Sequence, residues 1–452
     1  MTKATGTYSY RNIWRVAYPI LISLVMEQMI GLTDTAFLGR VGEVELGASA
    51  IAIIYYMVLF MIGFGFSLGA QIIIGRRNGE GNFLATGKIF WTGLYFVLGL
   101  AGGLIVLSEI FSPWLMGLMV SSEAIYDAAL SYVRWRLPGM AFAFVTTMFR
   151  AFYVGTTQTK TLTLNSIVMV LANVLFNWVL IFGHLGFEAM GALGAGVATL
   201  IARIAQCVIM VAYFFYTPKF REYTQQLFNL TRLNIKAMIE TMKVGLPIAF
   251  QMFMEASAFA LAGVLVLAFG AHSVSAYQIG TNMMNVTFMI VIAIGSATTI
   301  LTSHIYGRRN FGKLRHTVYA SYQLGLLWNI TIAILYIIFR NQIPTLFTSN
   351  QETIELTARM LIFIALFQVS DCLQAISISI LRGLQDVKAI MPIVFVSYVV
   401  FNIPVGYLLA FKTELESIGL IIGFIVGLSI CAVLTIRRVR RNINRLERSG
   451  GN

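Results

Sequence analysis

The sequence alternates between long apolar stretches and short polar segments along its whole length. We identify twelve apolar stretches of roughly 20 or more residues, each long enough to cross about 30 Å of hydrocarbon as a helix. They fall at about 14–38, 48–75, 85–108, 124–153, 161–184, 189–216, 240–268, 276–306, 315–340, 354–381, 388–411 and 417–436. The period-two alternation of a membrane β-barrel is absent. The pattern therefore predicts an all-α integral membrane protein with twelve transmembrane helices.

Composition and charge agree with a membrane protein. Hydrophobic residues make up 58% of the chain, charged residues only 11%, and the mean hydropathy is +0.80, which leaves too few polar side chains for a water-facing surface. The net charge of +13 gathers in the loops and ends on one side of the predicted spans, so we expect no nucleic-acid partner. The positive-inside rule places both termini in the cytoplasm. No cleavable signal peptide is expected before the first span.

The second half of the chain repeats the first. The quartet GRRN ends an apolar stretch at 75–78 and does so again at 307–310. Three further matches occur in the same order: PILISLVMEQ at 19–28 with PIAFQMFMEA at 247–256, FRAF at 149–152 with LRGL at 381–384, and NVLFNW at 173–178 with YVVFNI at 398–403. Matches at four ordered places indicate an internal duplication.

The duplication predicts two six-helix lobes that enter the membrane from the same side. Such parallel repeats are related by a pseudo-two-fold axis along the membrane normal, and the interface between them is where transporters bind substrate and alternate their access. The predicted parts are an N-terminal lobe at 1–216, an amphipathic cytoplasmic linker at 217–239, a C-terminal lobe at 240–437 and a basic cytoplasmic tail at 438–452. The repeat thus favours a transporter.

Four carboxylates lie inside predicted spans: Glu27, Asp34, Glu255 and Asp371. A charge within the hydrocarbon is unfavourable by about 2.5–3.5 kcal/mol on insertion scales, so each position requires a reason. One reason is a functional site in a wet cavity. The alternative is a neutral, hydrogen-bonded carboxyl that fastens two helices together.

Polar side chains three or four residues apart share a helix face with two of these acids in the second half. Two polar stripes contain an acid: Gln251 with Glu255, and Gln368 and Gln374 with Asp371. A third stripe, Gln278, Asn282 and Asn285 on the eighth span, contains none. We expect the three stripes to converge on one cavity, where a carboxyl can exchange a proton or bind a small cation.

In the first half, Asp34 is expected to meet Asn173, Asn177 and Thr199. The two asparagines are four residues apart and share a helix face. Oxygen ligands of this kind suit a hard cation such as Na+, and a proton on Asp34 would serve the same charge balance. Interhelical hydrogen bonding is the alternative role for the asparagines.

Here the sequence resembles the multidrug and toxic compound extrusion transporters, and their NorM-like branch in particular. The resemblance rests on the order of several motifs over nearly the whole chain: GLTDTAFLGRVG with Asp34, Glu255 after the proline of the seventh span, Asp371 in the tenth span, NVLFNW, and GALGAGVAT ending in Thr199. It implies a V-shaped pair of lobes that exports organic cations in exchange for Na+ or H+, in a bacterial inner membrane.

The resemblance also implies where the cation sites lie. Asp34, Asn173, Asn177 and Thr199 would form the site of the first lobe, and Glu255 with Asp371 that of the second, with Na+ as the possible metal at either. The resemblance assigns no role to Glu27. Pro19 and Pro247 lie inside spans ahead of these acids, and we expect helix bending there to couple carboxyl occupancy to lobe movement.

The sequence allows comparison with two other kinds of function, a lipid flippase and a membrane-embedded enzyme. Lipid-linked saccharide flippases have a related twelve-helix architecture and carry anionic substrates, and Arg134, Arg136 and Arg203 leave that possibility open. A membrane-embedded enzyme is disfavoured, because GFSLG at 65–69 lies in an apolar helix and no zinc, ATP or CxxC motif occurs. Glycines in that stretch and in the last span, namely Gly65, Gly69, Gly419, Gly423 and Gly427, are expected to allow close helix packing instead.

The expected protein is thus a secondary antiporter without a cofactor. It would act as a monomer in the inner membrane, with both termini cytoplasmic, and would exchange small organic cations for Na+ or H+ by alternating access. Cys207, Cys372 and Cys431 lie inside spans without a paired spacing and are expected to be packing residues.

Overall fold

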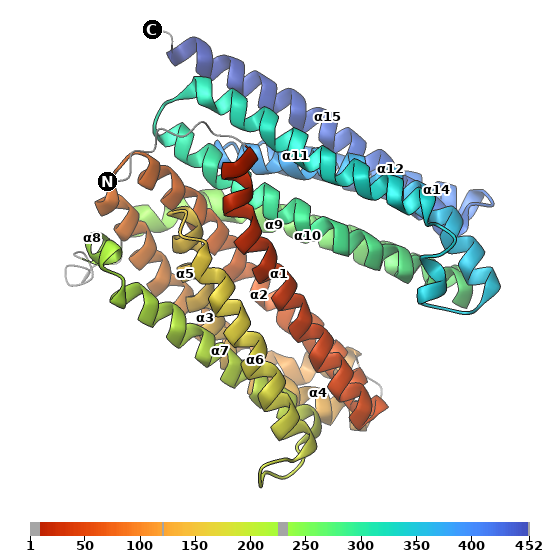
Figure 1. The fold of residues 1–452 in the computed structure, drawn as a ribbon. Coiled ribbons are helices and arrows are strands. Elements are labelled where there is room, and N and C mark those ends of the chain that lie inside the picture. Colours follow the sequence, from red (N-terminus) through yellow and green to blue (C-terminus); the bar gives the residue numbers. More distant parts are fainter. Residues whose placement is uncertain (1–9, 120–121, 225–233, 451–452) are drawn as a thin grey trace. The chain divides into compact units, whose positions relative to one another are not determined.

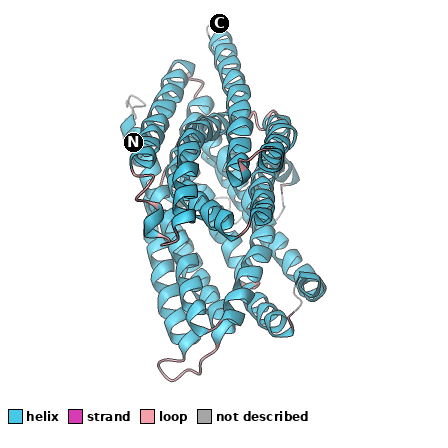
Figure 2. Cartoon of the chain, turned by 90° about the vertical axis from the view of Figure 1, so that its right-hand side faces the viewer, coloured by secondary structure: helices cyan, strands magenta, loops and turns pink. Residues whose placement is uncertain are grey.

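A computed structural model describes residues 10–119, 122–224 and 234–450. Within these ranges the chain consists of helices and short connections, and no strand occurs, as Figure 2 shows. The polar start at 1–9, the centre of the predicted linker at 225–233 and the last two residues of the predicted tail lie outside the described residues.

The helices follow one another along the chain, and Figure 1 labels most of them. In order they are α1 (Tyr10–Val41), α2 (Glu43–Gly79), α3 (Phe83–Met119), α4 (Glu123–Arg136), α5 (Gly139–Gly155), α6 (Lys160–Phe182), α7 (Gly191–Tyr216), η1 (Pro218–Phe220), α8 (Arg221–Thr224), α9 (Ile235–Leu265), η3 (Val266–Phe269), α10 (Ala271–Gly307), α11 (Phe311–Ile338), η4 (Pro344–Leu346), α12 (Gln351–Gly383), α13 (Ile390–Phe395), η5 (Val396–Asn402), α14 (Ile403–Lys412) and α15 (Glu416–Gly450). The segment η5 is a π-helix that joins α13 to α14 in one span.

Among the described residues, eleven helices are long and apolar enough to cross a membrane, and a bent pair brings the number to twelve. The pair is α4 and α5, which meet at 47°. Pro138 lies at the break, where its missing N–H and fixed φ prevent a continuous helix. These findings confirm the predicted all-α membrane protein with up to twelve spans.

The chain divides into two compact units. We call Ile22–Ala249 the N-unit, and the described residues of Met1–Leu21 with Phe250–Asn452 the C-unit. The chain passes from one unit to the other inside α1 and inside α9, in each case just after the proline of that helix. The lobe boundaries predicted from the sequence remain a prediction.

Aromatic packing and small residues hold the N-unit together. Phe214 of α7 lies with its ring centroid 5.4 Å from Phe90 of α3 and 5.1 Å from Phe152 of α5. Elsewhere α2 and the first half of α9 approach so closely that a Cβ at Gly69 would lie 2.6 Å from the Gly245 nitrogen. The expected close packing through the glycines of GFSLG is confirmed.

The last two spans of the C-unit also pack closely through glycines. A Cβ at Gly423 of α15 would lie 2.5 Å from the Gly406 Cα of α14, so the backbones touch without intervening side chains. Cys372 and Cys431 are fully buried free cysteines of this unit, and Cys207 is buried in the N-unit. Their predicted role as packing residues fits this placement.

The first GRRN quartet lies at the end of α2 and anchors the short helix α8. Arg77 pairs with Glu80 at 3.1 Å and with Glu240 of α9 at 3.1 Å. Tyr223 of α8 donates a hydrogen bond to Asn78 Oδ1 at 2.7 Å. Burial raises the pKa of this phenol to about 12, so it remains a donor at neutral pH. Basic residues at this helix end also interact favourably with the helix dipole.

Candidate functional site

The Asp34 carboxylate is buried in the N-unit against two asparagines of α6. Its Oδ1 accepts hydrogen bonds from Asn177 Nδ2 at 2.6 Å and from Asn173 Nδ2 at 3.2 Å. Asn177 Nδ2 also donates to Asn173 Oδ1 at 3.2 Å. The four-residue spacing places both amides on one helix face, so α6 presents a preformed pair of donors to the acid of α1.

Two buried oxygens of the predicted Asp34 site accept no hydrogen bond in the described part of the chain. Among the described residues, Asn177 Oδ1 and Thr199 Oγ1 are buried without a hydrogen-bond partner. Thr199 is 3% exposed on α7, and no bond joins it to Asp34 within the described part of the chain. Buried acceptors without donors are unfavourable unless a cation or a proton donor satisfies them. The oxygens are of the type that Na+ would accept as ligands.

The Glu255 carboxylate of α9 is the centre of the C-unit network. Its Oε1 accepts hydrogen bonds from Gln374 Nε2 of α12 at 2.8 Å and from Gln251 Nε2 at 3.0 Å. The Tyr398 hydroxyl of the π-helical η5 lies 3.4 Å from the same oxygen. Arg382 Nη2 in turn donates to Gln251 Oε1 at 2.7 Å. Three separate helical segments thus hold one half-buried carboxylate.

Asp371 of α12 lies in electrostatic range of Glu255 but has no hydrogen-bond or ion-pair partner among the described residues. It is 7% exposed. Gln368, one helical turn earlier, is fully buried, and neither of its amide atoms has a partner in the described part of the chain. Two neighbouring ionised carboxylates repel one another, so their arrangement favours the uptake of a proton or a small cation.

The polar stripe of α10 does not join this network. Gln278, Asn282 and Asn285 are exposed, and no hydrogen bond links Gln278 or Asn282 to Glu255 or Asp371 among the described residues. Of the three stripes predicted to converge, the structure therefore brings together the stripes of α9 and α12. Their use as a cation site remains a proposal.

Glu27 has a different environment from its repeat counterpart Glu255. Its Oε1 accepts a hydrogen bond from Arg150 Nη1 at 2.9 Å, an ion pair whose side chains are 38% and 18% exposed. Arg382 occupies the position equivalent to Arg150 in the FRAF and LRGL match, yet it reaches Glu255 only through the Gln251 amide. Glu27 therefore forms a direct ion pair with its arginine, whereas Glu255 does not.

The arginine partners of Glu27 and Gln251 were not predicted from the sequence. The alignment that matched Glu27 with Glu255 also matched Arg150 with Arg382, and this coincidence of two acid and arginine pairs was the available signal. No pattern in the sequence pointed to Tyr398. Its hydroxyl reaches Glu255 from a π-helical turn, a local irregularity that often marks functional sites and that periodicity does not reveal.

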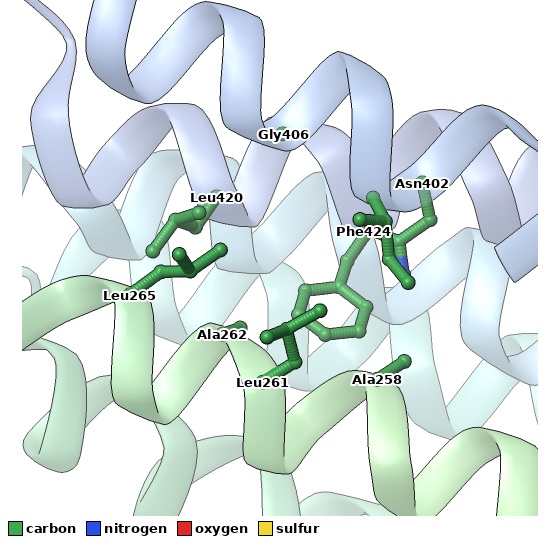
Figure 3. Close-up of a pocket in the computed structure, with 9 residues that line it drawn as sticks. Ala258, Leu261, Ala262, Leu265, Asn402, Gly406, Leu420 and Phe424 are labelled. Carbon is green, nitrogen blue, oxygen red and sulfur yellow. The ribbon is translucent and has the colours of Figure 1, made fainter. Parts of the chain in front are cut away.

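The C-unit also contains the counterpart of the Asp34 site, without its acid. By the repeat matches, Ala262 corresponds to Asp34 and Asn402 to Asn177. Both line one small pocket with Leu265, Leu420 and Phe424, as Figure 3 shows. Asn402 is 4% exposed, and its Nδ2 has no hydrogen-bond partner among the described residues. The duplicated fold therefore keeps the amide donor in both units but the carboxylate in one.

Pro19 and Pro247, the predicted hinge residues, lie inside α1 and α9. Each is followed closely by the point at which the chain passes between the compact units. Bending at these points remains a proposal.

Comparison with known sequences decides the family. A sequence model described as MatE matches residues 19–179 and 247–408, so two successive segments fit the same model. The chain belongs to the MatE family. This confirms the resemblance to multidrug and toxic compound extrusion (MATE) transporters, which are transporters and not enzymes. The double match also agrees with the internal duplication read from the sequence.

Named relatives extend over almost the whole chain. The protein is 30% identical over 443 residues to the multidrug resistance protein NorM of Aliivibrio fischeri, covering 96% of this chain and 95% of that protein. It is 27% identical to the multidrug resistance protein MdtK of Photorhabdus laumondii, covering 95% and 94%. The NorM-like character predicted from the motifs is thereby confirmed.

Solved structures share the fold. A MATE protein in a bent conformation gives a TM-score of 0.91 at 17% identity, covering 99% of this chain and 98% of the other. A multidrug resistance MATE transporter in an outward-facing conformation gives 0.88 at 18% identity, covering 98% and 97%. At these identities the likeness establishes the MATE fold alone.

Proposed function

We propose that this MATE protein is a secondary active antiporter that exports organic cations in exchange for Na+ or H+ by alternating access. The single observation that carries the proposal is the pair of intramembrane carboxylate networks, Asp34 with its asparagines and Glu255 with Asp371. The NorM and MdtK relatives described above are both named multidrug resistance proteins, which supports a drug as the exported cargo.

The C-unit network supports exchange because its acids are incompletely satisfied. Asp371 has no partner in the described part of the chain, and Glu255 is held by neutral amides with Arg382 one amide removed. A cationic substrate held by these carboxylates would lose its attraction once a proton or Na+ neutralised them. Binding of the coupling ion and binding of the substrate are then mutually exclusive.

The membrane potential supplies part of the driving force. Each positive charge that moves inward gains about 2.3 kcal/mol per 100 mV, which together with a concentration gradient can drive export of a cationic drug. Because the basic residues gather in the loops on one side of the spans, we place both termini in the cytoplasm. We further propose that the protein is a monomer of the inner membrane.

The experiment that tests the function uses the full-length protein in liposomes. Na+ and pH gradients are imposed separately, and the movement of ethidium across the bilayer is followed by fluorescence. We expect one of the gradients to drive ethidium transport that protein-free liposomes lack. Transport of ethidium that is indifferent to both gradients, or absent under both, would overturn the antiport mechanism.

A flippase for anionic lipid-linked saccharides is the second candidate. The observation in its favour is that Arg136 and Arg203 lie in electrostatic range of Asp34. In the same liposomes, a flippase would move a fluorescent anionic lipid between leaflets in preference to ethidium.

A further inference from the structure

Arg136 is the last residue of α4 and is held by two tyrosines of the N-unit. Its guanidinium carbon lies 4.8 Å from the ring centroid of Tyr56 on α2 and 5.4 Å from that of Tyr132, one helical turn earlier on α4. Its Nη1 also donates a hydrogen bond to the Tyr132 hydroxyl. Tyr132 is fully buried and Tyr56 is 8% exposed. We call this pair of rings the tyrosine box.

The charge in the tyrosine box has no ion-pair partner. Among the described residues, no carboxylate oxygen lies within ion-pair distance of Arg136, whereas Arg134 on the same helix pairs with Glu109 at 3.8 Å. The Asp34 carboxylate is nevertheless in electrostatic range of Arg136, and of Arg203 at a weaker level. Arg136 therefore attracts the Asp34 carboxylate from a distance without occupying its oxygens.

The hydrogen bonds that Asp34 accepts come from neutral donors. Asn177 and Asn173 donate to Oδ1, and Arg203 donates to Gln206 Oε1 at 3.1 Å rather than to the acid. An arginine normally engages a nearby carboxylate through two parallel hydrogen bonds. Here the guanidinium is instead placed against aromatic faces, which attract a delocalised cation through the ring quadrupole.

We propose that the tyrosine box is a binding site for flat, delocalised organic cations, and that Arg136 is its tethered occupant, which an entering substrate displaces. The inference rests on the proposed export of organic cations and names the site that recognises them in the N-unit. Clustered aromatic faces bind organic cations such as quaternary ammonium groups in other proteins, and here the Asp34 carboxylate adds an attractive charge. The substrates that fit it best carry a planar amidinium, guanidinium or ring-delocalised charge.

Displacement explains how the box can be selective. A small, strongly hydrated cation gains little from ring faces, so it does not compete with the guanidinium for the box. A planar aromatic cation gains the same ring contacts as Arg136 and adds apolar contact area. The tethered arginine thus sets a threshold that weakly binding cations do not exceed.

The test measures ethidium binding by fluorescence polarisation on the purified full-length protein. Arg136→Gln removes the tethered cation, and Arg134→Gln is the matched control two residues away on the same helix. We expect Arg136→Gln to bind ethidium about threefold or more tightly than the unmodified protein. Arg134→Gln should leave the affinity unchanged. The gain should disappear in Arg136→Gln combined with Tyr56→Leu.

An unchanged or weaker affinity in Arg136→Gln would overturn the proposal, as would a gain that survives Tyr56→Leu. Should Arg136→Gln fail to fold by size-exclusion chromatography, Arg136→Lys serves in its place. A compact ammonium stacks less well on the rings, so a gain in affinity is expected there too, and its absence would count against the tyrosine box. Because binding is measured without a gradient, loss of ion-driven transport in liposomes would contradict the antiport mechanism and leave this result intact.

Discussion

Arg150 donates a hydrogen bond to Glu27 at 2.9 Å, so the first intramembrane acid of the chain is already paired. Its repeat counterpart Glu255 receives the corresponding arginine only through Gln251. The duplicated acid is therefore charge-paired by an arginine in the N-unit, whereas in the C-unit no arginine among the described residues pairs with it directly. This difference suggests that coupling in the C-unit depends on Glu255 and that Glu27 serves structure.

Glu27→Gln should retain gradient-driven ethidium transport, whereas Glu255→Gln should lose most of it. Both members of the Glu27 ion pair are partly exposed, so its loss should lower the free energy of unfolding by only about 0–1 kcal/mol. The measurements are transport in liposomes and thermal unfolding in detergent. Arg150→Gln removes the other member of this ion pair and should have the same small effect as Glu27→Gln. A loss of coupling in Glu27→Gln as deep as that in Glu255→Gln would contradict the assigned roles.

Asn177→Ala should impair the Asp34 site more than Asn173→Ala. Asn177 makes the shorter bond to the carboxylate, 2.6 Å against 3.2 Å, and also holds Asn173 in place. Removing a hydrogen bond to a charged group lowers stability by about 1.5–3 kcal/mol. Two measurements report the effect. The first is the concentration of coupling ion at half-maximal efflux, and the second is the midpoint of unfolding. Equal effects from the two alanines would show that the bond lengths do not rank their contributions.

Ala262→Asp should recreate in the C-unit the acid and amide pair of the N-unit. Asn402 Nδ2 is buried without a partner beside Ala262, so the new carboxylate gains a ready donor. A double-mutant cycle with Asn402→Leu measures this coupling by chemical or thermal unfolding. We expect Ala262→Asp to be less destabilising by about 1 kcal/mol or more when Asn402 is present. Identical losses with and without Asn402 would refute the structural equivalence.

Gly69→Ala should destabilise the N-unit by about 1–3 kcal/mol, because the added Cβ would lie 2.6 Å from the Gly245 backbone nitrogen. Gly102→Ala in α3 is the matched control. A Cβ there meets nothing within 4 Å, and replacing a mid-helix glycine stabilises by roughly 0.5–1 kcal/mol. Unfolding temperatures of the two variants in one detergent should therefore shift in opposite directions. A neutral Gly69→Ala would argue against direct backbone contact of α2 with α9.

The spans could be predicted from the sequence because the bilayer imposes its own length scale. A stretch must remain apolar for roughly 20 residues to cross as a helix, and Pro138 marks where the fourth one bends. The Asp34 network was predictable for a similarly local reason. Two asparagines one helical turn apart share a face, and the structure places both against the acid.

The remainder of the site depends on how each helix is rotated about its axis. Gln278 and Asn282 form as regular a stripe as Gln251 and Glu255, but they are exposed in the structure. Periodicity identifies a polar face and does not say what that face meets. The reach of Arg382 to Gln251 and of Tyr398 to Glu255 likewise depends on tertiary packing between segments far apart in the sequence.

The most direct test of the central claim compares three variants in liposomes under an imposed Na+ or pH gradient. Asp34→Asn, Glu255→Gln and Asp371→Asn each remove one intramembrane carboxylate while preserving side-chain size, and size-exclusion profiles verify that each variant is folded. We predict that each loses the gradient-dependent part of ethidium transport. Gradient-driven transport at the unmodified rate in all three would contradict the role of these carboxylates in coupling.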